Sequence, residues 1–369
     1  MKSTNTIITD FSDTVTEHPA NDERRQRWPW TVDSKEMVSF DTAIRWPKIS
    51  IVTPSFNQGA FIEETIRSVL LQGYPNLEYI IIDGGSTDNT LSIIKKYDTW
   101  ITYWVSEPDR GQSHAINKGL KRCTGEIFNW LNSDDWYLPD TFFNIATAFL
   151  KNPSIQVLSG FENHINMDGS VSVDRGTFLA GTIEETIELC QLTQPSTFFK
   201  TELLRQIGFL PEDIHYIMDG EIWVRILLLY GHQCFLKISK PLVNFRLHEN
   251  SKTISNLTVD NFLIERSSMI IDLQTFIGVP AKVTDFWTTD VYNTPNHYKL
   301  NRQWLINKKI ITSKRLQRYF IRKYINLQFQ RNNLRNAHWG LKFLLSNFPP
   351  DYFIIKGFIK LLGKGRWHE

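Results

Sequence analysis

From residue 48 the sequence alternates between short β-branched runs and segments with helical spacing, and this alternation restricts the fold more than any other feature. The run KISIVTPSFN predicts a strand, and the glycine-terminated AFIEETIRSVLLQG predicts the helix that follows it. The same order recurs in LEYIIIDGG with STDNTLSIIKKY, ITYWVSE with GQSHAINKGLKR, and GEIFNWLNSDD with PDTFFNIATAFL. Four such pairs in succession predict a Rossmann-like α/β fold, with a mostly parallel central sheet flanked by helices on both faces.

The pattern changes beyond residue 155. The segment IQVLSGFENHINMDGSVSVDRGTF predicts an antiparallel hairpin with an Asp-Gly turn, and QPSTFFK predicts one short strand. YIMDGEIWVRILLLYG predicts a buried helix with Asp219 in its first turn, and CFLKISKPLVNFRLHENSKT predicts a closing pair of strands with His248 at its exit. From about residue 257 the pattern is helical. We therefore expect three regions, which cover residues 1–46, 47–255 and 256–369.

The composition is that of a globular protein in a reducing compartment. The chain has 369 residues, of which 41% are hydrophobic, so it can bury a large core. Its three cysteines are far apart and odd in number, which argues against a disulfide framework and a cysteine zinc site. The N-terminal stretch is polar, and no uncharged apolar run reaches the roughly 18 residues of a membrane span. We expect a cytoplasmic protein.

Positive charge is concentrated toward the C-terminal end. Residues 301–369 contain 15 Lys and Arg against 2 Asp and Glu, a net charge of +13. The first 300 residues contain 26 against 37, a net charge of −11. A basic, aromatic-rich segment suits an anionic surface, either nucleic acid or the acidic face of a bilayer. No RNA- or DNA-binding module is readable there, so we do not expect a nucleic-acid partner.

We predict that this basic region attaches peripherally to the anionic inner face of the cell membrane. Apolar residues recur in it at roughly helical spacing among pairs of basic residues, and FIIKGFIKLLGKGRW adds a second basic, apolar stretch. The alternative is that these faces pack on the main domain or form a solvated helical appendage. The apolar residues that carry the prediction are Ile306, Ile310, Phe320, Tyr324 and Leu327.

Polar side chains gather where the predicted parallel strands end. Ligands of such sheets bind beyond the carboxyl ends of the strands. Each residue taken alone is also a plausible helix cap or turn former, and for GGSTDNT alone that interpretation is the stronger one. Their shared edge favours a binding site instead. The residues at this edge are Ser55, Asn57, Asp83, Asp109, Asp134 and Asp135.

The adjacent Asp134 and Asp135 predict a site for a divalent metal ion. Mg²⁺ and Mn²⁺ prefer carboxylate oxygen and need few protein carboxylates when a substrate's phosphates supply the remaining ligands. A helix cap is the alternative, although the helix that we expect from Pro139 starts too far along the chain. His248 is the candidate for an additional imidazole ligand, although a histidine at a strand exit is more often a surface residue.

Six segments in this order resemble a family 2 glycosyltransferase with the nucleotide-diphospho-sugar transferase fold of the glycosyltransferase-A type. The resemblance covers roughly residues 48–255 and implies an inverting, metal-dependent enzyme of the hexosyltransferase type. It would transfer a sugar from a nucleotide-diphosphate sugar, most simply a UDP-sugar, to a hydroxyl of a glycan or lipid-linked acceptor in bacterial surface polysaccharide assembly. The segments are ISIVTPSFNQGAFIEETIRSVLLQGYPNLEYIIIDGGSTDNT, EPDRGQSHAINKG, WLNSDDWYLP, QPSTFFK, MDGEIWVR and RLHENSKT.

The resemblance implies roles for residues on the nucleotide side of the site. Phe56 would stack on the base, with Thr53 lining the same turn. Asp83 would read the base and ribose, but Gly84 stands where the family signature has its second acidic residue, which leaves the base preference open. Asp109 would also lie near the nucleotide.

The resemblance also implies the metal and catalytic residues. Asn132 replaces the first aspartate of the family's Asp-x-Asp motif and would hydrogen-bond a ribose hydroxyl as part of the donor site. Asp134 would bind Mn²⁺ or Mg²⁺ together with His248, and Asp135 would support the donor site from behind. Asp219 would be the catalytic base, its alternative role being a helix cap that complements the helix dipole.

Two other functions use some of the same residues. A metal-dependent nucleotidyltransferase also needs a carboxylate pair, but it usually has a Lys/Arg-rich loop for a triphosphate, and residues 48–60 contain only Lys48. A non-catalytic protein that binds nucleotide sugar or polysaccharide is the second alternative. Measuring whether nucleotide is released from a bound donor separates that protein from an enzyme.

Overall fold

The computed structural model describes residues 29–30, 43–249, 251–252, 259–293, 300 and 302–364. Most of the expected N-terminal region, residues 1–46, therefore lies outside the described residues. The chain divides into two compact units. The first carries the sheet, and the second is helical and includes two segments, 180–190 and 224–231, that precede its main part from residue 257 onward. The sequence pattern did not predict that these two segments belong with the C-terminal helices.

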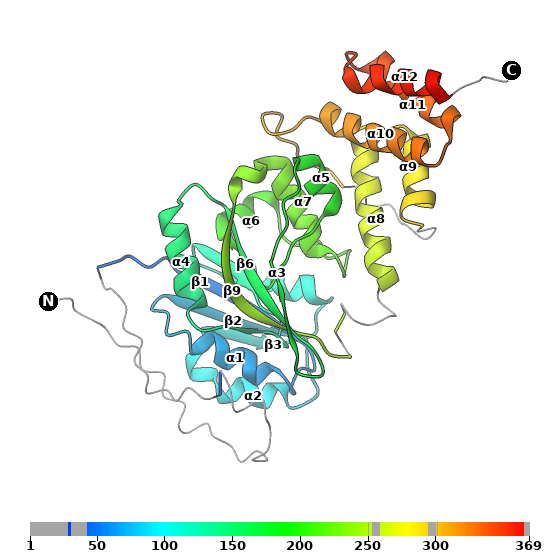
Figure 1. The fold of residues 1–369 in the computed structure, drawn as a ribbon. Helices are drawn as coiled ribbons and strands as arrows, with labels where there is room; N and C mark the ends of the chain where they lie inside the picture. The colour runs from blue at the N-terminus through cyan, green and yellow to red at the C-terminus, as the bar shows by residue number, and fades with distance from the viewer. Residues whose placement is uncertain are drawn as a thin grey trace. The chain divides into compact units, whose positions relative to one another are not determined.

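The first half of the sheet is parallel, as the strand–helix alternation predicted (Figure 1). β1 (Ile49–Ser55) lies between β2 (Leu77–Asp83) and β4 (Ile127–Trp130), and β3 (Tyr103–Ser106) lies beyond β2. All four predicted helices follow these strands. They are α1 (Ile62–Leu70), α2 (Thr90–Lys96) with a 3₁₀ turn at Asp98–Trp100, α3 (Gln112–Arg122) and α4 (Thr141–Lys151).

The second half of the sheet is mixed. β8 (Thr197–Lys200) is antiparallel to β4, and β6 (Val157–Ile165), β9 (Phe235–Arg246) and β5 (Trp136–Tyr137) follow in that order. β7 (Val171–Asp174) forms the predicted antiparallel hairpin with β6. The remaining helices of this stretch are α5 (Ile183–Leu189), α6 (Thr201–Ile207) and α7 (Met218–Tyr230), which is followed by a 3₁₀ turn at His232–Cys234.

The predicted closing pair of strands is wrong. Residues 235–246 form one twelve-residue strand, β9, which runs parallel to β6. The Ser-Lys-Pro sequence in its middle resembles a turn, but Pro241 lies opposite Phe161 where the register of the two strands shifts. A strand irregularity can place the proline where it is not needed as a ladder donor. The chain therefore continues as one strand to Arg246, two residues before His248.

The sheet packs its main hydrophobic core on one face. Alternate residues of β1 and β2, such as Ile49 and Ile51 or Tyr79 and Ile81, join one buried cluster. Apolar side chains of α1, α2 and α4 complete this cluster, so these helices cover that face, whereas α3 contacts β1 and β2 outside it. Because the core holds the strands through the face of the sheet, the loops at the strand ends are not needed for the core and can form a site.

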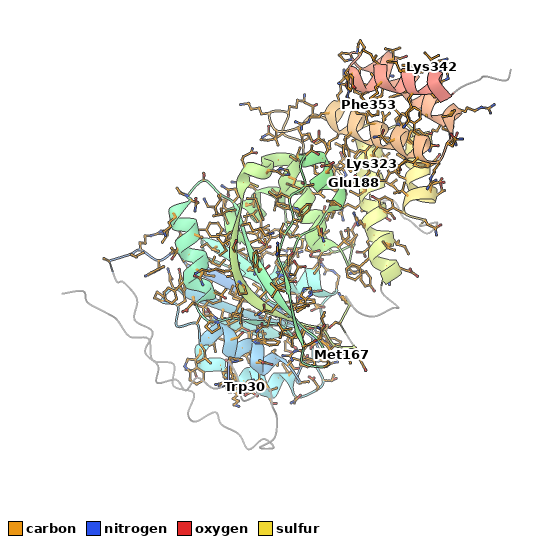
Figure 2. The ribbon with its side chains drawn as sticks, in the orientation of Figure 1. Trp30, Met167, Glu188, Lys323, Lys342 and Phe353 are labelled. Atoms are coloured by element: carbon orange, nitrogen blue, oxygen red, sulfur yellow. The ribbon has the colours of Figure 1, made fainter. Side chains whose placement is uncertain are left out.

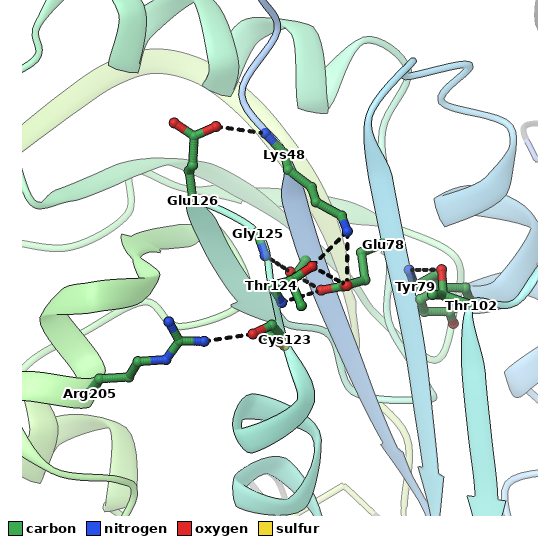
Figure 3. Close-up of polar contacts among 10 residues, drawn as sticks. Lys48, Glu78, Tyr79, Thr102, Cys123, Thr124, Gly125, Glu126 and Arg205 are labelled. Carbon is green, nitrogen blue, oxygen red and sulfur yellow. Dashed lines mark hydrogen bonds and ion pairs between the residues drawn. The ribbon is translucent and has the colours of Figure 1, made fainter.

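A buried carboxylate holds together the amino ends of three strands, opposite the expected site (Figure 3). Glu78 accepts hydrogen bonds from Ser50 Oγ at 2.5 Å and from Thr124 N and Oγ1 at 2.7 and 2.6 Å. Lys48 Nζ lies 3.1 Å away. Burial alone would raise the pKa of Glu78, but these donors lower it to about 2. The ionised carboxylate therefore links β1, β2 and the turn before β4.

The second unit is helical, as expected from residue 257. Its helices are α8 (Val259–Phe276), α9 (Ala281–Phe286), α10 (Ser313–Gln330), α11 (Leu334–Asn347) and α12 (Tyr352–Lys364), and a π-helical segment at Trp287–Val291 extends α9. α5 joins this unit through two carboxylates. Glu184 accepts from Arg315 Nε at 2.5 Å, and Glu188 pairs with Lys323 (Figure 2).

The apolar face that the sequence assigned to the membrane is partly wrong. Phe320 and Tyr324 of α10 are buried among the helices of the second unit. Ile306 and Ile310 precede α10 and are not helical. The helical spacing of apolar residues by itself cannot distinguish a face that packs on neighbouring helices from one that contacts lipid. None of the described helices is long and apolar enough to cross a membrane.

Candidate active site

The two predicted metal ligands meet at one edge of the sheet. Asp134 lies in the turn between β4 and β5, and His248 lies two residues beyond β9. β5 pairs antiparallel with β9, which brings that turn beside the exit of β9. His248 Nε2 is 3.0 Å from Asp134 Oδ2, and the two side chains are 15% and 22% exposed, respectively. A carboxylate and an imidazole from distant parts of the chain are thus adjacent and partly accessible.

Asp135 is buried behind this pair. Its Oδ1 accepts a hydrogen bond from the backbone N–H of Arg246 at 2.9 Å, and its Oδ2 accepts one from Asn132 Nδ2 at 3.5 Å. Burial, and then the charge of Asp134, raise the pKa of Asp135 well above its usual range. The side chain therefore supports the turn that carries Asp134, and its role in donor binding stays a prediction.

Arg246, the last residue of β9, is a residue of the site that the sequence analysis missed. Its Nε donates to the backbone oxygen of Asp134 at 3.0 Å, and its guanidinium pairs with Glu64 of α1. The guanidinium also lies 4.4 Å from the ring centroid of Trp136 and 5.0 Å from that of Phe61. These contacts connect the turn that carries Asp134 to the end of β9 and to α1. Arg246 lies in the segment RLHENSKT, two residues before His248, but its role depends on the pairing of β5 with β9, which the segment alone does not reveal.

The loop after β2 is organised around Asp83, which is fully buried. Asp83 Oδ2 accepts from Gly85 N at 3.1 Å, Ser86 N at 2.8 Å and Ser106 Oγ at 2.6 Å, and Oδ1 accepts from Ser86 Oγ at 2.5 Å. Ser86 Oγ also accepts from the backbone N–H of Asn57, in the loop after β1. Asp83 thus orders two adjacent loops, and the predicted contact of Asp83 with base and ribose stays a prediction.

Phe56, Gly84 and Asp109 gather at the same edge from three different loops. Phe56 is 58% exposed, although phenylalanine is usually buried. A Cβ atom added to Gly84 would lie 2.7 Å from Asp109 Oδ2 and 3.4 Å from a Phe56 ring carbon. The carboxylate of Asp109 therefore occupies the space beside residue 84. A carboxylate is present close to where the family signature has its second acidic residue, but it comes from another loop.

The structure also places the two remaining donor-site candidates. Thr53 lies within β1 and is fully buried, with its Oγ1 3.1 Å from the hydroxyl of Tyr79. It therefore lies in the sheet rather than in the turn, and its role in donor binding stays a prediction. The strand simply extends two residues further than the turn residues suggested. Asn132 is partly exposed, and its Oδ1 accepts from Gln112 Nε2, at the start of α3, at 2.7 Å. Asn132 therefore lies at the edge, between β4 and the Asp134 turn.

Asp219 lies in the first turn of α7, as predicted. The preceding residue, Met218, contacts Ser113 of α3 through its sulfur at 2.8 Å, and Asp219 Oδ1 accepts from Gly220 N at 2.8 Å. Burial raises the pKa of Asp219 to about 6, and the negative charge of Glu162 contributes to the rise. A carboxyl with this pKa can take up a proton close to neutral pH.

Glu162 belongs to a second polar cluster that the sequence analysis missed. Glu162 and His164 lie two residues apart on β6, Asp174 of β7 is opposite Glu162, and His164 Nε2 is 2.7 Å from Glu162 Oε1. One ligand atom from each of the three residues lies within 4.8 Å of the others. Within the described residues, the buried Glu162 Oε2 has no hydrogen-bond partner. The charge of Glu162 also raises the pKa of Asp135, so the cluster is close to both parts of the site.

This cluster left a weak signal in the sequence. Alternate residues of a strand point to one face, so Glu-x-His on the first strand of a predicted hairpin, with an aspartate on the second, could bring three such groups together. Only the register of the hairpin decides whether they meet. The cluster offers a second set of groups that can hold a divalent ion.

Comparison with known proteins gives a consistent set of matches. The model of glycosyl transferase family 2 matches residues 50–208. An uncharacterized glycosyltransferase of Rickettsia typhi is 31% identical over 208 residues, which cover 52% of this chain and 63% of the relative. An uncharacterized glycosyltransferase of Mycobacterium tuberculosis is 30% identical over 194 residues, which cover 50% of this chain and 70% of the relative. The chain thus spans less than two thirds of the Rickettsia relative.

Two solved structures are among the matches. The S. aureus TarS fragment 1–349 in complex with UDP has a TM-score of 0.49 and 20% identity, and the match covers 74% of this chain and 80% of that chain. The mannosyltransferase PcManGT from Pyrobaculum calidifontis, in complex with GDP-Man and Mn²⁺, has a TM-score of 0.44 and 17% identity, with coverages of 87% and 81%.

Proposed function

Because the chain belongs to glycosyltransferase family 2, we propose that it transfers a sugar from a nucleotide-diphosphate sugar to an acceptor hydroxyl with inversion at the anomeric carbon. The observation that carries the proposal is the meeting of Asp134 and His248, 114 residues apart, at the carboxyl edge of the parallel strands. This edge is where open α/β sheets bind their ligands. The same edge holds the exposed ring of Phe56 and the carboxylate of Asp109.

The donor nucleotide would bind over the loops after β1, β2 and β3. The exposed Phe56 ring offers a surface for the base to stack on. Asp109 and Asn132 have polar atoms at this edge that can form hydrogen bonds with the ribose hydroxyls or with polar groups of the base. Asp83 holds the two loops in position through its bonds to Ser86. A UDP-sugar is the donor that we propose.

The residues at the edge fit a divalent ion. Asp134 and His248 present one carboxylate oxygen and one imidazole nitrogen within hydrogen-bond distance of each other, a donor set that suits Mn²⁺ or Mg²⁺ when a diphosphate supplies further oxygens. When bound there, such an ion supplies Lewis-acid stabilisation to the diphosphate leaving group. Two hydrogen bonds hold the turn around Asp134 in place. Arg246 Nε donates to the backbone oxygen of Asp134, and the backbone N–H of Arg246 donates to Asp135 Oδ1.

Asp219 is the residue that we propose as the base. A single displacement by an acceptor hydroxyl needs a group that removes the hydroxyl proton, and such a group typically accelerates the step by about 10²- to 10⁴-fold. The raised pKa of Asp219, about 6, keeps it ionised at neutral pH and makes it a better proton acceptor than an ordinary aspartate. Attack on the face opposite the leaving group inverts the anomeric centre.

The proposed acceptor molecule and setting come from the resemblance of the sequence segments. We propose a hydroxyl of a glycan or of a lipid-linked sugar, in bacterial surface polysaccharide assembly on the cytoplasmic side of the membrane. Charge around the site agrees with a hydroxyl acceptor rather than a phosphate, because Glu162, Asp174 and Asp219 are all acidic and would repel a second phosphate group.

The test is direct binding of donor nucleotides to the full-length protein. A panel of UDP- and GDP-sugars is titrated by calorimetry with Mn²⁺ present or with EDTA. We expect one nucleotide class to bind with Mn²⁺ and to lose most of its affinity with EDTA, and Phe56→Ala to weaken that binding through loss of base stacking. Phe209→Ala is the control, since Phe209 is also exposed but its side chain contacts Lys121 of α3. A protein that binds none of these nucleotides would contradict the proposal.

A further inference from the structure

Helix α12 carries a line of exposed apolar side chains. Tyr352, Ile355, Ile359 and Leu362 are 75%, 55%, 62% and 72% exposed, respectively. Their spacing of three, four and three residues puts all four on one face of the helix. Exposed apolar residues are common when scattered, but a continuous stripe of large ones marks an interaction surface. We call these four residues the α12 stripe.

The opposite face of α12 is already used for packing. Ile354 and Leu361 are buried at 1% and 2% exposure. A Cβ atom added to Gly357 would lie 2.5 Å from Leu341 Cδ2, so the backbone of α12 approaches α11 closely at this point. Because α12 packs on its neighbours through this side, the residues of the α12 stripe are not needed for the packing of the helices in the second unit.

The α12 stripe is flanked by positive charge. Lys356 and Lys360 are exposed and follow Ile355 and Ile359 directly in the chain. The helix itself, residues 352–364, contains no Asp or Glu. Asp351, just before it, pairs with Arg318 and Arg322 of α10, so its charge is compensated locally. On the adjacent α11, Lys342 and the 49% exposed Leu345 repeat the combination of a basic and an apolar residue (Figure 2).

We infer that the α12 stripe inserts into the headgroup region of an anionic lipid bilayer, with α12 lying in the plane of the surface. A bilayer offers acyl chains to the four apolar side chains and anionic headgroups to the lysines beside them, so it complements both features. Lysine side chains can extend from the edge of such a face to the headgroups while their methylene stems remain in the apolar zone.

A second copy of the chain complements the surface less well. Two α12 stripes related by a twofold axis would bring the lysines of both helices together. No acidic side chain of α12 could pair with them, so the like charges would oppose the contact. An anionic bilayer is therefore the occupant that the α12 stripe fits best. All of the stripe except Tyr352 lies in the segment FIIKGFIKLLGKGRW of the predicted membrane-binding region, whereas Phe320 and Tyr324 of the same region are buried.

The test is sedimentation of the full-length protein with lipid vesicles at low salt. We expect binding to vesicles that contain phosphatidylglycerol and little binding to pure phosphatidylcholine, with the difference falling as salt rises. The double variant Ile355→Asp/Ile359→Asp should bind at least about tenfold more weakly, because it places two carboxylates against acyl chains and anionic lipid. Lys356→Gln/Lys360→Gln should weaken binding to the anionic vesicles only.

The control is Leu150→Asp/Met167→Asp, which adds the same two charges at exposed apolar residues of the first unit. This variant should sediment like the wild type, and thermal denaturation should confirm that all variants fold. Absence of binding to anionic vesicles, or an equal loss in the control, would overturn the inference. So would light scattering that shows a dimer broken by Ile355→Asp/Ile359→Asp without any vesicle binding, since the occupant would then be a second copy. None of these readouts depends on glycosyl transfer.

Discussion

Asp219 links the rate of the proposed reaction to pH. Burial raises its pKa to about 6, so the side chain is mostly protonated below that pH and cannot accept the proton of an acceptor hydroxyl. We expect the rate of sugar transfer to rise with pH and to level off above an apparent pKa near 6. An ordinary aspartate would give a profile with an apparent pKa of about 4. A profile of kcat against pH, recorded across both values, distinguishes the two.

The variant Asp219→Asn tests the same residue without a change of pH. Asparagine keeps the size and the hydrogen bond from Gly220 but cannot take up a proton, so turnover should fall by about two to four powers of ten. Donor affinity should barely change, because the proposed nucleotide contacts involve other residues. Near-normal turnover would leave Asp219 as a structural residue of α7.

Two clusters compete for the divalent ion, and single substitutions separate them. If Asp134 and His248 bind it, Asp134→Asn should abolish the effect of Mn²⁺ on nucleotide binding, whereas Glu162→Gln should retain it. The number of Mn²⁺ ions bound per chain, followed by electron paramagnetic resonance, gives the readout. Loss of the ion in Glu162→Gln and its retention in Asp134→Asn would assign the site to Glu162, His164 and Asp174 instead.

The site residues that the sequence predicted are those next to strand ends. Asp134 and Asp109 follow predicted strands directly, so their placement at one edge needed only the strand–helix pattern. The contribution of Arg246 was not predictable, because it depends on β5 pairing with β9 across more than 100 residues. Thr53 was misplaced because β1 continues through Pro54 to Ser55, two residues further than the turn residues suggested, so Thr53 lies in the sheet rather than in the turn.

At the level of elements, Glu78 is the contact that joins three strands at their amino ends. Glu78→Ala would leave the buried Ser50 and Thr124 donors without their acceptor, and we expect it to lower the free energy of unfolding by about 3 kcal/mol. The matched control is Glu126→Ala, which removes an exposed ion pair with Arg45 and a long, exposed hydrogen bond from Lys48 N in the same region, and should cost about 0 to 1 kcal/mol. Urea denaturation of both variants makes the comparison. Equal losses of unfolding free energy in the two variants would mean that Glu78 stabilises the fold no more than an exposed ion pair does.

The elements were predictable where hydrophobic periodicity and turn residues agreed. Each strand of the parallel half is followed by a helix with its own apolar face, as for α1 and α4, so the pattern left little choice. The prediction for β9 was wrong because Ser239, Lys240 and Pro241 are typical of a turn. In the structure, the register between β9 and β6 shifts at Pro241, so the strand continues through the proline. A turn signature inside a long strand cannot be interpreted without knowing the neighbouring strand.

At the scale of the whole chain, the residues proposed for the active site and the excess of positive charge lie in different parts of the sequence. The first 300 residues carry a net charge of −11 and contain every residue proposed for the donor, the metal and the base. Residues 301–369 carry +13 and contain the α12 stripe. The sequence predicted a basic, apolar region that includes FIIKGFIKLLGKGRW, but not which of its apolar side chains stay exposed, because burial of Phe320 and Tyr324 depends on how the helices of the second unit pack.

Release of nucleoside diphosphate from a nucleotide sugar tests the central claim most directly. The full-length protein is incubated with the UDP- or GDP-sugar that it binds, Mn²⁺ and candidate glycan or lipid-linked acceptors, and free nucleoside diphosphate is measured over time. We predict steady release that requires an acceptor, stops with EDTA and is lost in Asp134→Asn. A protein that binds the donor but releases no nucleotide with any acceptor, or one that turns over unchanged in Asp134→Asn, would contradict the account.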